Sequence, residues 1–124
     1  MSIKISLILE SKIWDVETAA AELGIAPYEI IKEYPKNSSL GSTWYTQVIT
    51  DSRCIDEPLK MIQARTMPKI DSVLAICKKY ELTPMIQIVV RSDYPNRPEI
   101  TFEPSDIEFI HLLHAEVSMD VIIE

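Results

Sequence analysis

The sequence has segments at both ends in which every second residue is apolar. The first set is Ile3, Ile5, Leu7 and Leu9, and the last is Val117, Met119, Val121 and Ile123. Alternation places successive side chains on opposite faces of a β-strand, so each segment is expected to bury one face and to leave the other face polar. Strands of this kind indicate an open sheet that has helices on one side and water on the other.

The first half of the chain predicts a strand, a helix and a hairpin. Asp15 is a good N-cap, and Gly24 suits the left-handed position that ends the helix. The segment 28–34 is compatible with a helical turn or a strand. We favour a strand, because the Pro/Asn/Ser/Gly cluster at 35–42 leads into a second alternating segment at 43–50, which together predict a hairpin.

Two helices are expected next, over about 57–66 and about 69–81. Pro68 separates them because proline breaks or kinks a helix. The second of these helices places its apolar residues on one stripe, which is typical of a helix packed on a core. A strand is then predicted at 85–91.

The remaining segment predicts a short strand at 99–103 with Ile100 and Phe102 pointing inward, followed by a helix and the closing strand. Ser105 and Glu108 have the spacing of a capping box at the start of that helix. The expected order is β-α-β-β-α-β-β-α-β. This is a single α+β domain over residues 1–124, with a ferredoxin-like core, an extension, and a two-layer, open, mainly antiparallel sheet with helices on one face.

Several kinds of chemistry are excluded by residue counts. The chain has two glycines, whereas phosphate-binding loops, dinucleotide fingerprints and the Gly-x-Ser-x-Gly nucleophile elbow each need more. Glu108, His111 and His114 follow a helical spacing, but the capping role of Glu108 explains it better than a metal does. We therefore expect a protein that is not an enzyme and has no cofactor and no metal.

The composition also bears on compartment and partners. The apolar stretch near the N-terminus is too short and too interrupted for a signal peptide or a membrane span, and the two cysteines form no paired motif. A reduced, cytoplasmic protein is expected. The formal net charge of −7 argues against binding to nucleic acid or to an anionic membrane.

The negative charge is concentrated in one part of the sequence. Residues 1–97 hold all 12 Lys and Arg residues and 12 acidic residues, whereas residues 98–124 hold seven acidic residues and no Lys or Arg. If the strands at 99–103 and 117–123 share one sheet, alternation places four carboxylates on its open face. These are Glu99, Glu103, Asp120 and Glu124.

Such an acidic face predicts a docking site for a basic protein, because complementary charge accelerates encounter and orients the partner. Tyr45 and Tyr94 are candidate anchors beside the acidic face. Alternation directs the Trp44 side chain inward and the Tyr45 side chain to the other face of the same strand.

Three sequence features carry a resemblance. They are Leu-Gly-Ile-Ala-Pro at 23–27, Trp44 at the start of a later strand, and Ile-Thr-Phe-Glu-Pro-Ser-Asp-Ile-Glu-Phe-Ile at 100–110 before a closing Asp-Val-Ile strand. In this combination the chain resembles a family of small bacterial domains of unknown function. Some such proteins serve as immunity proteins beside toxins of contact-dependent or secreted inhibition systems. The resemblance implies a cognate protein toxin as the partner and no catalytic residues.

Two functional hypotheses follow. The first is a non-enzymatic immunity protein that neutralises a basic toxin through the acidic face. The alternative is a domain that binds a small ligand or forms a homodimer through an unpaired edge strand.

Overall fold

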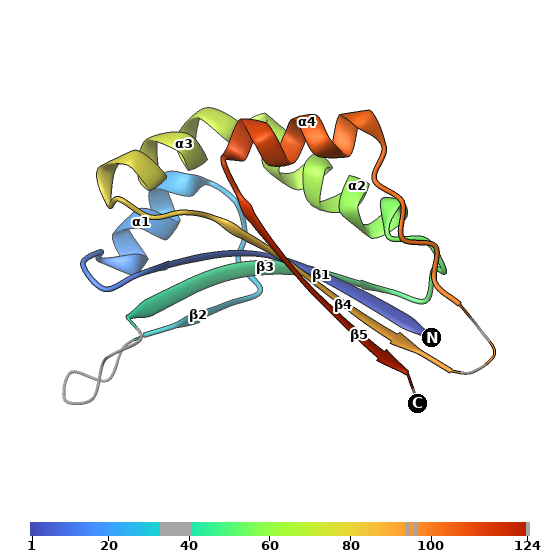
Figure 1. The fold of residues 1–124 in the computed structure, drawn as a ribbon. Coiled ribbons are helices and arrows are strands. Elements are labelled where there is room, and N and C mark those ends of the chain that lie inside the picture. Colours follow the sequence, from blue (N-terminus) through green and yellow to red (C-terminus); the bar gives the residue numbers. More distant parts are fainter. Residues whose placement is uncertain (33–40, 94, 96, 124) are drawn as a thin grey trace.

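One five-stranded sheet organises the fold, and all the helices lie on one of its faces (Figure 1). The computed structural model describes residues 1–32, 41–93, 95 and 97–123. The strands are β1 (Ser2–Ser11), β2 (Glu29–Ile31), β3 (Ser42–Thr50), β4 (Met85–Ser92) and β5 (Glu116–Ile123). The helices are α1 (Val16–Leu23), α2 (Asp56–Thr66), α3 (Ile70–Lys79) and α4 (Pro104–Leu113), and a 3₁₀ turn (Met67–Lys69) joins α2 to α3.

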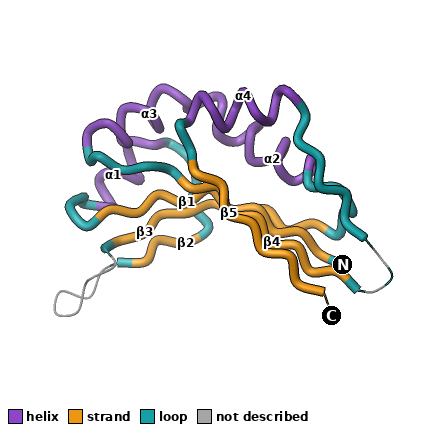
Figure 2. The backbone as a smooth tube through the Cα atoms, viewed as in Figure 1, coloured by secondary structure: helices purple, strands orange, loops and turns teal. Residues whose placement is uncertain are grey.

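The strand order is β2-β3-β1-β4-β5, and each neighbouring pair is antiparallel except β4 and β5, which are parallel. Figure 2 shows the strands as one layer with the helices grouped on one side. The predicted α+β class and the mainly antiparallel open sheet are confirmed. The predicted pairing of the segment 28–34 with the segment 43–50 is confirmed, because β2 pairs antiparallel with β3 over residues 29–31. Residues 35–40 of the predicted turn lie outside the described residues.

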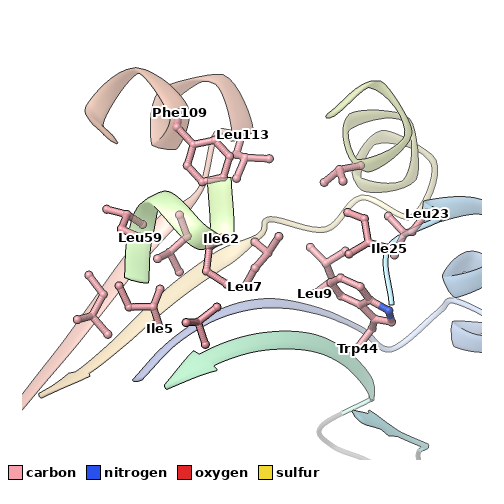
Figure 3. Close-up of a cluster of buried hydrophobic side chains, with 14 of the residues drawn as sticks. Ile5, Leu7, Leu9, Leu23, Ile25, Trp44, Leu59, Ile62, Phe109 and Leu113 are labelled. Atoms are coloured by element: carbon pink, nitrogen blue, oxygen red, sulfur yellow. The ribbon is translucent and has the colours of Figure 1, made fainter. Parts of the chain in front are cut away.

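The core lies between β1 and the helices (Figure 3). The four alternating apolar side chains of β1 are fully buried, and β3 and β4 pair with its two edges. Trp44 lies opposite Leu9 in the register and is also fully buried, as the sequence predicts. Leu59 and Ile62 of α2 and the α4 residues Phe109 and Leu113 close the layer. The helix-covered face of the sheet is therefore the buried one.

The ends of α1 form as expected. The Asp15 carboxylate accepts hydrogen bonds from the amides of Glu17 and Thr18, and Gly24 has a φ of 68°. The Thr18 hydroxyl also donates to the Asp15 carboxylate, at 2.9 Å, and this bond together with the amide hydrogen bonds holds the pKa of Asp15 below its ordinary value. Pro68 lies in the 3₁₀ turn between α2 and α3, where the sequence places the break.

The predicted strand at 99–103 is wrong. Glu99 alone forms a β-bridge, with Cys54, and residues 100–103 form neither helix nor strand. Pro98 and Pro104 bracket this segment, and proline has no N–H to contribute to a strand ladder. Ile100, which was expected to point inward, is exposed.

The predicted capping box at Ser105 and Glu108 is wrong, because the box of this helix lies two residues earlier. Glu103 is the N-cap of α4 and Asp106 is its partner at N3, instead of Ser105 and Glu108. Pro104 explains the shift, because its fixed φ and missing N–H suit the first helical position.

Candidate protein-binding edge

The outer edge of β5 is the candidate site. Among the described residues β5 has one strand neighbour, β4, and its other side is not paired. The amide of Glu116 donates to the carbonyl of Pro84 at 2.9 Å, so the backbone of Glu116 points toward β4. Successive residues of a strand direct their backbone groups to opposite sides. The amides and carbonyls of Val117, Met119, Val121 and Ile123 therefore point to the free edge.

The side chains of these same four residues form what we call the apolar strip. In the register Val117, Met119 and Val121 lie beside Ile86, Ile88 and Val90, so they are on the helix-covered face, as the alternation predicts. Their burial is not as predicted, because the exposed fractions of the four strip residues are 43, 37, 44 and 70% along the strand. An edge strand has no further neighbour to cover it, so a continuous apolar surface remains in contact with water.

A hollow of about 260 Å³ lies where α4 approaches the apolar strip. Phe102, Ile107, Ile110 and Val117 line it, and Ile107 is itself exposed. The lining is entirely apolar and shares Val117 with the strip. The strip and the hollow therefore form one apolar surface. An apolar side chain of a partner bound along the edge of the sheet would fit into the hollow.

The open face of β5 has the opposite chemistry. Glu116, Ser118, Asp120 and Ile122 point to this face, because they alternate with the strip residues, so its first three positions are polar and the last is apolar. No ion pair or side-chain hydrogen bond of Glu116 or Asp120 occurs within the described part of the chain. Lys4 of β1 and Asp120 of β5 both lie beside Val89 of β4, one on each side of it. Because β4 lies between β1 and β5, the backbones at Lys4 and Asp120 are roughly 10 Å apart. Neither β5 carboxylate therefore has a direct ionic partner in the described structure, although Arg91 lies on the same face of β4, opposite Ile122, and is a cation near Asp120.

The sequence-predicted acidic face does not assemble. Glu99 lies in the loop that pairs with Cys54, Glu103 caps α4 in the helix layer, and Asp120 lies on the open face of the sheet. The prediction is wrong because it requires 99–103 to be a strand of the sheet. Glu124 and Tyr94 lie outside the described residues.

Tyr45 does lie on the open face, as predicted, but far along the sheet from β5. Its hydroxyl donates to the Glu29 carboxylate at 2.8 Å, and its ring is 5.6 Å from that of Tyr28. The hydrogen bond to Glu29 raises the pKa of the Tyr45 hydroxyl. Two strands, β1 and β4, separate it from β5, so it does not contribute to the same contact as Asp120.

A buried ionic cluster, which we call the Asp106 cluster, holds α4 on α2. The Asp106 carboxylate is fully buried, accepts from Lys60 Nζ and Gln63 Nε2 at 2.5 Å each, and accepts from the Glu103 amide at 2.9 Å. Lys60 Nζ also donates to Asp56 at 2.7 Å. This cluster was not predicted from the sequence, although the Asp56–Lys60 spacing of one helical turn was a signal for it.

Opposing effects set the pKa values in the cluster. Burial raises the pKa of Asp106, but hydrogen bonds, above all from Lys60, outweigh it and hold that pKa below its ordinary value. Burial lowers the pKa of Lys60, but the Asp106 and Asp56 carboxylates raise it overall. The Lys60 ammonium lowers the pKa of Asp56, whereas the nearby Asp106 carboxylate and burial raise it above its ordinary value. Lys60 is therefore charged and fully engaged, which is typical of a structural contact.

Two other features are absent from the described ranges. No group of three or more His, Cys, Asp or Glu side chains there is arranged to hold a metal ion. None of the helices found there is long and apolar enough to cross a membrane.

Comparison with protein families gives a match to the family described as "Domain of unknown function (DUF4279)", over residues 1–124. The chain belongs to this family. Membership in the DUF4279 family confirms the resemblance to a domain of unknown function. Comparison of this DUF4279 chain with curated proteins and with solved structures gave no match.

Proposed function

We propose that this DUF4279 domain is a non-enzymatic protein-binding domain that acts by docking on a partner through the outer edge of β5. The observation that carries the proposal is the apolar strip, which lies directly beside unpaired backbone donors and acceptors. Exposed apolar surface next to an open strand edge is costly in water and prone to pairing. A partner that covers both would remove that cost.

The partner class we propose is a basic protein toxin, with this chain as the immunity protein that neutralises it in the bacterial cytoplasm. The support is the charge of the docking surface: Glu116 and Asp120 lie along the same strand as the strip, and neither has a described ionic partner. A basic partner would gain electrostatic attraction at this edge, while acidic proteins would be repelled. The acidic docking site of the proposal is therefore β5 and not the four-carboxylate face expected from the sequence.

Growth rescue tests this function. A toxin domain encoded next to this chain is expressed in a test bacterium with and without the chain. Growth should stop with the toxin alone and return with the chain. The charge reversal Asp120→Lys should weaken rescue, whereas Glu57→Lys, the same charge change on an exposed position of α2, should not. Absence of rescue, together with no binding between the two purified proteins at low salt, would overturn the proposal.

A further inference from the structure

The free edge of β5 combines three properties that together describe a complementary strand. Its backbone donors and acceptors at 117, 119, 121 and 123 are unpaired in the described structure. Its helix-covered face presents the apolar strip, and its open face presents carboxylates at Glu116 and Asp120. We infer that the partner adds a β-strand to this edge, and that this strand alternates apolar with basic residues. The inference rests on the proposed function and specifies how the partner is recognised.

Backbone pairing gives the geometry. A strand placed beside β5 would continue the sheet order beyond β5 and satisfy the outward-pointing amides and carbonyls. Its side chains would alternate between the two faces, as those of β5 do. Every second side chain would then lie beside the apolar strip, and the others would lie beside Glu116, Ser118 and Asp120.

The hollow at the start of the strip provides an anchor site. It is next to Val117 and is also lined by Phe102, Ile107 and Ile110. An apolar side chain of the added strand, near the Val117 end, would enter it and remove the exposed face of Ile107 from water. This contact fixes the register, because a slip by one residue would direct a basic side chain into an apolar hollow.

Charge selects a basic strand over a second copy of this chain. β5 carries Glu116 and Asp120 and no Lys, Arg or His, and the whole chain has a formal net charge of −7. An antiparallel pair of two β5 strands centred on Asp120 places the two copies of this carboxylate opposite each other, and one centred on Ser118 places Asp120 opposite Glu116. Registers centred on Met119 or Val121 place Asp120 opposite Ser118 or Ile122, and in these registers the repulsion comes from the net charge of the two copies. Like charges at directly opposed positions destabilise a strand pair, whereas Lys or Arg there would stabilise it.

The test uses a synthetic, acetylated and amidated peptide, Val-Lys-Val-Arg-Val-Lys-Val, titrated into the ¹⁵N-labelled full chain. We expect the largest amide shifts at Val117, Met119, Val121 and Ile123, and weaker binding as salt is raised. The same peptide with Glu in place of each basic residue should not bind.

The variant Val121→Pro distinguishes binding through backbone strand pairing from binding through charge attraction alone. The Val121 amide points to the free edge, so proline removes an outward donor without taking one from the β4–β5 ladder. We expect peptide binding to weaken about tenfold or more in Val121→Pro and to change little in Val121→Thr, which keeps the amide. A peptide N-methylated at alternate residues gives the same comparison with the protein unchanged, and it should also lose binding.

Several outcomes would overturn the inference. Equal binding of the N-methylated peptide, or equal binding by Val121→Pro, would exclude strand addition. Such a result, obtained while the chain still binds and neutralises a whole toxin, would leave the proposed function standing and reject only this mode of recognition. Equal binding of the Glu peptide would reject the basic partner strand. Sedimentation of the chain as a dimer that Val121→Pro dissociates would show that the edge is occupied by a second copy.

Discussion

β1 and β5 have the same sequence pattern and opposite environments. Both alternate apolar with polar residues, apart from one apolar residue each on the open face, Ile8 in β1 and Ile122 in β5, and in both the alternating apolar residues point to the helix-covered face. In β1 these residues are fully buried, whereas in β5 they are between 37 and 70% exposed. The difference is position in the sheet, since β1 has a strand on each side and β5 on one side. Alternation thus identifies which face is apolar, and the number of neighbours decides whether that face is buried.

The largest expected effect is a contrast between truncations of the two strands. Ile5→Ala removes a fully buried side chain of β1 and should lower the free energy of unfolding by about 3–4 kcal/mol. Met119→Ala removes an exposed one from β5 and should cost less than about 1 kcal/mol. Urea denaturation measures both. Similar losses for the two variants would mean that the strip is covered in solution.

A second prediction concerns the link between β5 and the rest of the molecule. Asp106→Ala removes the centre of the Asp106 cluster and should cost about 2–3 kcal/mol, because Lys60 and Gln63 lose a buried acceptor. β5 follows α4 directly, so its amide hydrogens should exchange faster in this variant while those of β1 stay protected. Asp106→Asn keeps an acceptor for the Glu103 amide and should have a smaller effect. An equal increase in amide exchange rates in β1 and β5 would contradict a local role of the Asp106 cluster.

Acid should weaken the Asp106 cluster, which holds α4 and the following strand β5 on α2. The folded-state pKa of Asp106 lies below its unfolded value, so its stabilising contribution is present above about pH 4 and is lost as the pH falls through the folded value. The raised pKa of Asp56 acts in the opposite sense, and because Asp106 causes part of that shift, Asp106→Asn changes both contributions together. The stability difference between wild type and Asp106→Asn should be roughly 1–2 kcal/mol at pH 6 and should shrink toward pH 3. A difference that grows on acidification would contradict this assignment.

The smallest effect compares the ends of two helices. α1 ends at Gly24 and α4 ends at His114, with φ of 68° and 53°, so both C-caps are left-handed. His114→Gly relieves a strained backbone and should raise the free energy of unfolding by about 0.5–1 kcal/mol. Gly24→Ala should lower it, because it introduces strain and places Cβ 3.3 Å from Lys69 Cε. Thermal unfolding of the two variants should therefore shift in opposite directions.

Much of the fold could be predicted because it depends on local patterns. The β1 alternation, the Asp15 cap, the Gly24 stop and the Pro68 break each act through neighbours in the sequence. The segment 99–103 was mispredicted because its alternation resembled a strand, while the prolines on both sides of it prevented a ladder.

The candidate site could be predicted only in part. Asp120 was correctly placed on the open face, since strand alternation is sufficient for that. The prediction that four carboxylates share one face was wrong, because it depended on which strands are neighbours in the sheet. The local periodicity of a sequence does not show which strands are neighbours. The Asp106 cluster joins residues 46 positions apart, so it was beyond any local pattern.

The central place of β1 has a consequence for folding kinetics. Its two neighbours are β3 and β4, and Ile3 pairs with Thr50 on one side and with Val90 on the other. The central strand of the sheet must therefore wait for contacts that are distant in sequence, and such topologies fold more slowly than helical bundles of equal size. Until β4 docks, the chain has a second open edge at β1, more hydrophobic than the one that persists in the native state. Refolding at high concentration should aggregate through β1, and chaperone binding would be most useful in that interval.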